Sequence, residues 1–202
     1  MNPAKTTDKT IRAALVDKLH DEHARDPKVR IINELGINHG SIRADIAVIN
    51  GVMHAYEIKS DLDTLKRLHG QAEAYNEVFD KVTIVTGADH LYDVIESVPD
   101  WWGITIARLD NDGKLHLLSV RNAENNTSKN SISIARLLWR DEALAILEGI
   151  GEARGLRSKT RGQIYQKLAS SVELDSLCTK VRETLFHRGA WRADQPLLIH
   201  GD

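Results

Sequence analysis

Two apolar segments on either side of Asn50-Gly51 constrain the fold more than any other feature of the sequence. Residues 42–49 and 52–59 are rich enough in β-branched and apolar residues to form strands. Asn-Gly between two such segments is a strong indicator of a β-hairpin. An apolar segment at 29–35 precedes them across a turn at 38–40. The sequence therefore predicts a three-stranded meander in the first third of the chain.

Helical and strand patterns surround this meander. Apolar residues at three- and four-residue spacing predict helices over 8–25 and 63–79, and Asp61 or Asp63 is the expected cap of the second helix. The following segments predict a strand at 81–86, a short helix at 89–96 and strands at 104–109 and 114–120. This order predicts an α/β fold in which helices flank a mixed β-sheet.

The last third of the chain has a different character. A polar, Asn- and Ser-rich stretch at 121–131 is the best candidate for a linker. Helical spacing then continues over 135–148, 160–171 and 174–187. We therefore expect two parts, a core over 1–125 and a helical C-terminal region over 132–202. The helical region is also basic, with nine lysines and arginines against four acids between residues 151 and 192, which suits a polyanionic partner or a solvated helical face.

Composition excludes several classes of protein. A chain with 42% hydrophobic and 28% charged residues is neither disordered nor fibrous. Its apolar runs are too short to span a bilayer, and its first residues lack the apolar core of a secretion signal. Cys178 is the one cysteine, which fits a reducing compartment. We therefore expect a cytoplasmic protein with no membrane partner.

Three charged residues on the meander carry the candidate chemistry. Glu57 and Lys59 lie two apart on one strand and therefore share a face, and Asp45 lies on the neighbouring strand. Two carboxylates can hold Mg²⁺, which polarises a phosphate and activates a water. A lysine beside them can orient that water or offset developing charge. These requirements describe phosphodiester hydrolysis, although acids and lysines on strands also occur simply as solvent-facing residues.

The strand register decides whether the carboxylates meet. A two-residue turn at Asn50-Gly51 would place Asp45 opposite Tyr56 and separate it from Glu57. A three-residue loop, or a bulge at the glycine, would place Asp45 opposite Glu57. Across the preceding turn, Glu34 falls beside Asp45 or its neighbour Ala44 and is a candidate third metal ligand. Glu22, near the end of the first helix, is the rival for that role.

Asp45, eleven residues, then Glu57-Ile58-Lys59 resembles the core motif of the PD-(D/E)XK nuclease superfamily. The helix that follows carries Gln71 and Tyr75, similar to the Gln-x-x-x-Tyr motif of bacterial recombination helicase–nucleases. The stretch from Arg43 to Val85 is closer still to a little-characterised bacterial and phage branch. The resemblance covers residues 8–86 and implies a restriction-endonuclease-like core. The proline that gives the superfamily its name is absent before Asp45.

The resemblance also implies a role for each residue. Asp45, Glu57 and the backbone carbonyl of Ile58 would bind Mg²⁺, with Mn²⁺ as a substitute, and Lys59 would assist the attacking water. Gln71 would be a further catalytic residue that faces the site. Substrate contacts are expected from Tyr75, which could equally be a core aromatic, and from two basic residues at the start of the same helix, Lys66 and Arg67.

The function implied is a metal-dependent deoxyribonuclease in DNA repair, recombination or the processing of phage and mobile elements. The alternatives are a non-catalytic nucleic-acid-binding or adaptor module on the same fold, or an unrelated α/β domain with an accidental motif. Single-stranded, duplex and branched DNA, and RNA, all remain open as substrates. Nucleases of this size often dimerise to cut two strands, so a homodimer is a further alternative to a monomer.

The C-terminal region holds a second, weaker pattern. Residues 144–169 have the form of a helix, a turn at Gly155 and another helix that begins near Lys159 and Arg161. This resembles a SAP-type DNA-binding module, in which basic residues at a helix N-terminus suit phosphate contact. An αα-hairpin that only packs on the core fits the same pattern.

Overall fold

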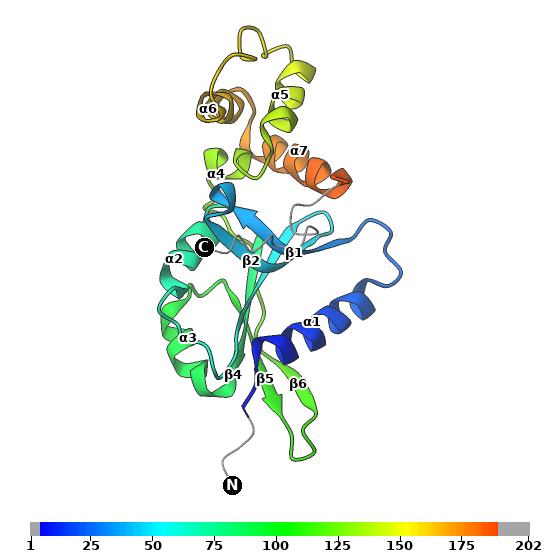
Figure 1. The fold of residues 1–202 in the computed structure, drawn as a ribbon, viewed down its shortest axis with the longest axis vertical. Coiled ribbons are helices and arrows are strands. Elements are labelled where there is room, and N and C mark those ends of the chain that lie inside the picture. Colours follow the sequence, from blue (N-terminus) through cyan, green and yellow to red (C-terminus); the bar gives the residue numbers. More distant parts are fainter. Residues whose placement is uncertain (1–4, 190–202) are drawn as a thin grey trace, which may run out of the picture.

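A computed structural model describes residues 5–189 of the chain, and a six-stranded mixed sheet runs through its centre (Figure 1). The sheet order is the chain order, with β3, β4 and β5 parallel to one another and the other neighbours antiparallel. Its strands are β1 (Arg30–Ile37), β2 (Ile42–Ile49), β3 (Met53–Lys59), β4 (Lys81–Gly87), β5 (Gly103–Leu109) and β6 (Leu115–Arg121). The predicted α/β class, with a mixed sheet and a helical C-terminal part, is confirmed.

Helices cover both faces of this sheet. The helix α1 (Asp8–His23) lies on one face, where Ile11, Leu15 and Leu19 pack against one core cluster. The helices α2 (Leu68–Asn76) and α3 (Leu91–Ser97) lie on the other face and bury a larger cluster. Short 3₁₀ turns, η1 (Asn38–Gly40) and η2 (Ala88–His90), follow β1 and β4. No helix within residues 5–189 is long and apolar enough to cross a membrane.

The hairpin between β2 and β3 has the longer of the two predicted loops. Ile49 pairs with Met53 and Ile46 pairs with Tyr56, so three residues form the loop. Gly51 adopts φ +91°, a left-handed conformation that glycine takes without strain. Continued by one residue beyond its last pair, this register would set Asp45 opposite Glu57, as the nuclease interpretation requires.

The second helix begins later than the sequence predicts. It starts at Leu68 rather than near residue 63, and its N-cap Arg67 makes no side-chain capping bond. The two expected caps serve other segments. Asp63 accepts hydrogen bonds from the amide and hydroxyl of Ser60, and Asp61 accepts them from Thr6. Both aspartates therefore stabilise the loop after β3 instead of the helix.

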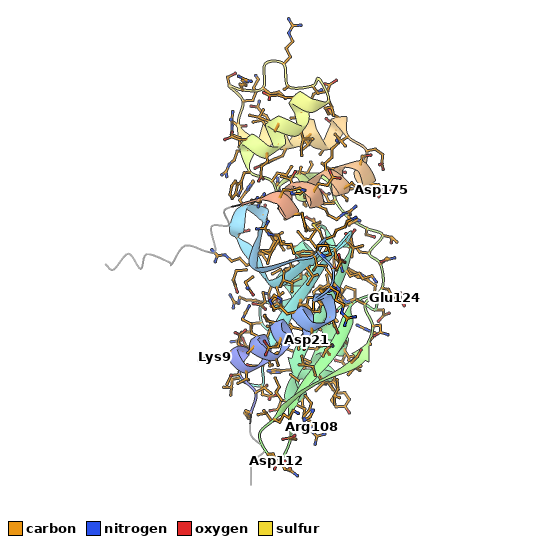
Figure 2. The ribbon with its side chains drawn as sticks, turned by 90° about the vertical axis from the view of Figure 1, so that its right-hand side faces the viewer. Lys9, Asp21, Arg108, Asp112, Glu124 and Asp175 are labelled. Atoms are coloured by element: carbon orange, nitrogen blue, oxygen red, sulfur yellow. The ribbon has the colours of Figure 1, made fainter. Side chains whose placement is uncertain are left out.

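The C-terminal helices share the core of the sheet. They are α4 (Ser131–Ala135), α5 (Arg140–Gly149), α6 (Arg161–Ser171) and α7 (Leu174–His187). The helix expected over 135–148 is thus split into two around residues 136–139. One apolar cluster runs without interruption from the α2 face of the sheet into these helices, which stack beyond the β1–β2 end of the sheet (Figures 1 and 2). Residues 1–4 and 190–202, the outer ends of the two predicted domains, lie outside the described residues.

The predicted linker is a packed segment. Residues 122–130 lack regular structure, but Asn126 is buried and its side-chain amide donates to the carbonyls of Asn76 and Phe79. Its backbone amide donates to the carbonyl of Asp80. The polar composition of this stretch therefore serves hydrogen bonding to the end of α2 and the start of β4.

Asp80 joins the sheet to the C-terminal helices. This buried carboxylate accepts the Met53 amide at 2.7 Å and pairs with Lys129, within the packed segment, and with Arg182 of α7 at 3.4 Å. Removing one partner of a buried ion pair leaves the remaining charges uncompensated.

We predict that Asp80→Ala lowers the free energy of unfolding by about 3 kcal/mol, measured by urea denaturation. The exposed Asp112→Ala should change it little. An Asp80→Ala protein as stable as the Asp112→Ala control would contradict the role given to Asp80.

His54 on β3 makes stability depend on pH. Burial, followed by the charges of Lys81 and His23, lowers its pKa to about 4 from 6.5, and its ring hydrogen-bonds Thr83 at 2.8 Å. The unfolded chain therefore binds a proton between these values that the folded chain does not bind. Stability is fully present above pH 6.5 and is lost as the pH falls towards 4.

We predict that this loss amounts to up to about 3 kcal/mol and that His54→Gln flattens the stability profile between pH 6.5 and 4.5. The exposed His20→Gln is the control and should keep the wild-type slope. Equal slopes for His54→Gln and wild type, in urea titrations at each pH, would refute the assignment.

Candidate active site

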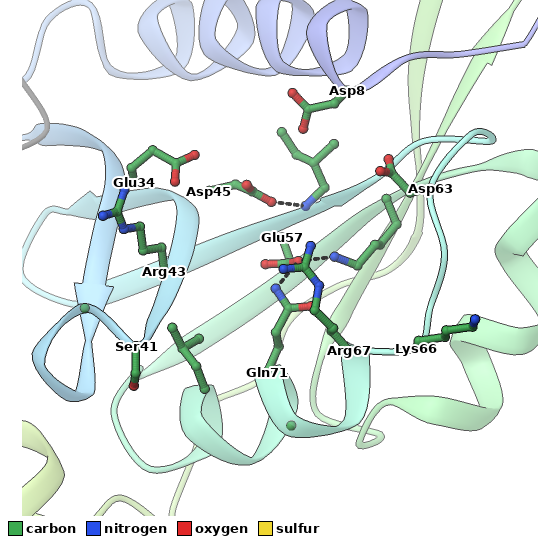
Figure 3. A pocket seen from close by; sticks show the side chains of 15 residues that line it. Asp8, Glu34, Ser41, Arg43, Asp45, Glu57, Asp63, Lys66, Arg67 and Gln71 are labelled. Carbon is green, nitrogen blue, oxygen red and sulfur yellow. Dashed lines mark hydrogen bonds and ion pairs between the residues drawn. The ribbon is translucent and has the colours of Figure 1, made fainter. Parts of the chain in front are cut away.

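Most of the predicted site residues line one pocket of about 620 Å³ at the β2–β3 end of the sheet (Figure 3). Its walls come from the start of α1, the η1 turn, β2, β3 and the beginning of α2. The predicted residues among them are Glu34, Asp45, Glu57, Ile58, Lys59, Lys66, Arg67 and Gln71. Asp45 and Glu57 therefore face one cavity. An unrelated domain with an accidental motif would have no need for this arrangement.

The pocket forms where two strands lose their regular alternation together. In β1, Ile32 and Leu35 pack on the same face although they are three residues apart. In β2, Ala44 and Ala47 do the same. The β1–β2 register pairs Asn33 with Ile46 and Leu35 with Ala44 and skips Glu34 and Asp45, which lie between them. Glu34 has φ +55°, which is unusual for a residue with a side chain. This shared irregularity turns the strands locally at the two candidate ligands.

Asp45 takes the place of a backbone acceptor at this point. The pairing of β2 with β3 ends at Ile46 and Tyr56. Beyond it, Oδ2 of Asp45 accepts the Ile58 amide at 2.8 Å. The carboxylate is thereby fixed between the strands, with 19% of its side chain exposed.

Arg12, a residue that the sequence analysis did not single out, braces the acids from α1. Its guanidinium donates to Oδ1 of Asp45 at 2.8 Å and to the Asp45 carbonyl at 3.1 Å. It also contacts Glu34 at 3.4 Å and Asp8 at 3.1 Å. Asp8 itself lines the pocket. Asp8 and Arg12 are four residues apart on a predicted helix, and this spacing is the feature of the sequence that indicates their ion pair.

Glu57 is a buried carboxylate held by three donors. Its side chain is 1% exposed, and Oε1 pairs with the Lys59 ammonium and accepts Nε2 of Gln71 at 2.6 Å. Its other oxygen, Oε2, accepts the hydroxyl of Tyr75. Figure 3 shows Glu57 beneath Asp45 and next to Gln71. Strand β3 supplies the acid and the lysine, and α2 supplies the other two donors.

Electrostatics in the pocket favour the entry of positive charge. Burial raises the pKa of Glu57, and the nearby Asp45 carboxylate raises it further, while Lys59 and Tyr75 oppose the rise. Burial, then Asp45, also raises the pKa of Glu34. Carboxylates that raise each other's pKa repel one another when ionised, and a cation between them stabilises the ionised forms.

The donor set suits a hard divalent cation completed by water or phosphate. Mg²⁺ is commonly held by one or two carboxylates together with waters and substrate oxygens. The Gln71 carbonyl oxygen, Oε1, is buried and has no hydrogen-bond partner within residues 5–189. In that same range, no three histidine, cysteine or carboxylate side chains gather into a metal-binding group. Asp45 and Glu57 therefore fit an ion that takes further ligands from the substrate.

Tyr75, for which a substrate contact was one prediction, lies in the core. Its side chain is fully buried, with its ring 5.8 Å from Trp102 and 5.5 Å from Phe79. Burial and the adjacent Glu57 raise the pKa of its hydroxyl, so the hydroxyl stays protonated and donates to Glu57. Tyr75 is therefore a core aromatic, as the second interpretation of this residue predicts, and it also donates a hydrogen bond to Glu57.

The two basic residues predicted in the C-terminal region lie outside this pocket. Arg161 is exposed and lines a second cavity, and Lys159 is exposed in the turn before α6. Gly155 in the α5–α6 connection has φ +74°. Glu22, the rival to Glu34, is also outside the pocket, where it pairs with Lys18 at 3.6 Å on the surface of α1.

Comparison with known proteins assigns the chain to a phage family. The family described as Bacteriophage P4 protein cII matches residues 1–195. The chain belongs to this family. A curated relative, protein cII of Enterobacteria phage P4, is 38% identical over 94 residues. That match covers 46% of this chain and 35% of the relative, so the chain spans about a third of the relative's length.

A solved structure shows a limited likeness to this cII family member. The SPO1766 protein of unknown function from Silicibacter pomeroyi is 16% identical, with a TM-score of 0.39. The match covers 75% of this chain and 94% of the other.

The Glu57 network predicts unequal effects for two buried tyrosine hydroxyls. In this cII family member, Tyr75 donates to a carboxylate, whereas Tyr165 donates to the Leu138 carbonyl at 2.8 Å. Hydrogen bonds to charged groups are worth about 1.5–3 kcal/mol and neutral ones about 1 kcal/mol. We predict that Tyr75→Phe lowers the free energy of unfolding more than Tyr165→Phe does, as measured in urea at pH 7. Equal losses would show that the Glu57 contact adds nothing.

Proposed function

We propose that the chain is a metal-dependent nuclease that hydrolyses DNA phosphodiester bonds, built on a restriction-endonuclease-like core. The observation that carries the proposal is the convergence of Asp45, Glu57 and Lys59 on one open pocket at an irregular strand pair. A buried acid paired with a lysine beside a second acid is costly to keep in a fold, and burial of charge on that scale is more typical of active sites than of scaffolds.

Each residue has a chemical task in this proposal. Asp45, Glu57 and the Ile58 carbonyl, with Glu34 as a further donor, would hold Mg²⁺ or Mn²⁺. When bound, such an ion polarises the phosphate and lowers the pKa of a coordinated water. The Lys59 ammonium orients the attacking water and offsets negative charge that develops on the phosphate.

The remaining pocket residues position the substrate and the acids. Gln71 and Tyr75 fix the two oxygens of Glu57, so the acid keeps one orientation. Lys66 and Arg67 are exposed at the entrance beside α2 and are suited to phosphate contacts. The match with a phage family supports a role in the processing of phage or mobile-element DNA, with repair and recombination as the other settings.

A non-catalytic nucleic-acid-binding or adaptor module is the second candidate. Arg12 and Lys59 already neutralise Asp45 and Glu57, which permits the fold to persist with no metal. On this alternative the chain would bind DNA without cutting it.

The test is cleavage of labelled single-stranded, duplex and branched DNA with Mg²⁺, Mn²⁺ or EDTA. We expect metal-dependent cleavage that Asp45→Asn and Lys59→Met each reduce by about 100-fold or more. Glu73→Gln and Lys18→Ala, which change exposed residues of α2 and α1, are the matched controls and should cleave like wild type. Circular dichroism establishes that each variant is folded.

Two outcomes would overturn this function. Binding without cleavage on every substrate would favour the adaptor. Cleavage unchanged in Asp45→Asn would place the active site elsewhere.

A further inference from the structure

A second cavity lies beside the candidate active site and is lined by arginines. Its volume is about 490 Å³, and it lies between the β1–β2 turn and the C-terminal helices. We name it the arginine cleft, defined by the five arginines in its wall, Arg43, Arg136, Arg140, Arg161 and Arg188. They come from β2, from the segment between α4 and α5, from the helices α5 and α6, and from the end of α7.

Positive charge in the arginine cleft is only partly compensated. Its two acids are already engaged, because Glu34 contacts Arg12 and Asp141 contacts Arg140. Within residues 5–189, three other guanidinium groups of the cleft make no ion pair with a carboxylate. They belong to the exposed Arg43 and Arg161 and to the half-buried Arg136, drawn from three separate parts of the chain.

The field of these arginines acts on a neighbouring histidine. Burial, followed by the charges of Arg161 and Arg136, lowers the pKa of His39. The His39 ring lies 5.5 Å from that of Tyr165. The cleft therefore combines partly compensated positive charge with the exposed ring of His39, which lies against the buried Tyr165.

An exposed tryptophan adds a flat apolar face. Trp139 keeps 40% of its surface exposed in the arginine cleft. The Arg188 guanidinium lies 4.5 Å from its ring centroid and forms ion pairs with Glu142, which holds the ring in place. Basic grooves with exposed aromatic rings are typical of surfaces that bind single strands, because unpaired bases stack on the rings.

The cleft and the active-site pocket are adjacent and share part of their walls. Glu34, Gly40 and Arg43 line both, and Figure 3 shows Glu34 and Arg43 on the side of the pocket opposite Lys66. Gly40 has φ +87° and no atom within 4 Å of the position where a Cβ would stand, so no neighbouring atom crowds this shared residue.

We propose that the arginine cleft binds the phosphate backbone of a single-stranded DNA segment and leads it into the active-site pocket, with Trp139 as a stacking surface. This inference rests on the proposed nuclease function for its direction, but binding to the cleft requires no chemistry. A single strand fits the exposed aromatic ring, whereas the bases of a duplex are already stacked on one another.

The test measures binding in EDTA, where metal-dependent cleavage cannot occur. Fluorescence anisotropy with a labelled 20-nucleotide strand and the matching duplex is recorded between 50 and 200 mM salt. We expect the double variant Arg136→Ala/Arg161→Ala to bind the single strand about 10-fold more weakly and to lower the salt slope by about 1.4, the value for two phosphate contacts. Trp139→Leu should weaken binding of the strand more than binding of the duplex.

The control is Arg25→Ala/Arg108→Ala, which removes two exposed arginines that do not line the cleft (Figure 2 labels Arg108). It should bind like wild type. Equal binding by the cleft variant and this control would overturn the proposal, as would a wild-type preference for duplex.

The two proposals fail separately. Loss of binding in the cleft variant supports the cleft even if no substrate is ever cut. Cleavage without any effect of the cleft substitutions upholds the nuclease and refutes the cleft.

Discussion

The burial of the Glu57 carboxylate is the constraint on which the site depends. A carboxylate that is 1% exposed is unfavourable unless donors surround it. The donors come from Lys59 on β3 and from Gln71 and Tyr75 on α2. The two donors from α2 reach Glu57 only if this helix packs at one distance and orientation from β3. The position of α2 in turn places Lys66 and Arg67 at the entrance. One buried charge thus links the packing of a helix to the geometry of a pocket.

The other face of the site depends on α1. Arg12 reaches Asp45 and Glu34 only because the start of α1 is anchored. Thr6 donates its amide and hydroxyl to Asp61 at 2.8 and 2.7 Å, and Asp61 also accepts the Asp89 amide. The chain before α1 is therefore joined to loops after β3 and β4. These contacts hold the helix across the end of the strands, where its arginine balances the two acids.

Much of this arrangement could be predicted from local sequence patterns. The Asn50-Gly51 dipeptide predicted the β2–β3 hairpin, and the β2 strand was predicted with its observed bounds. The spacing of Asp45, Glu57 and Lys59 placed these three residues around one pocket, and the family resemblance added Ile58, Lys66, Arg67 and Gln71. Hairpin register remained open in the sequence, because a glycine permits both loop lengths and only packing of the flanking strands selects between them.

Other features depend on contacts that are distant in sequence. Nothing local indicates that Glu34 adopts a positive φ, that Arg12 crosses to Asp45, or that Asp61 and Asp63 hold loops rather than cap α2. The polar stretch at 122–130 looked like a linker because hydrogen bonding to a neighbouring segment and exposure to water favour the same residue types. Of the arginine cleft, the sequence predicted only a basic residue at Arg161 and an excess of basic residues between 151 and 192. The residues of the cleft come from separate elements, so no local pattern joins them.

The most direct test of the central claim is whether the Asp45–Glu57 pair binds a divalent cation. Electron paramagnetic resonance of Mn²⁺ titrated into the purified protein separates bound from free ion without any DNA present. The account predicts saturable Mn²⁺ binding that Asp45→Asn removes and that Mg²⁺ displaces. Absence of bound Mn²⁺ in the wild type, or binding that survives Asp45→Asn, would contradict it.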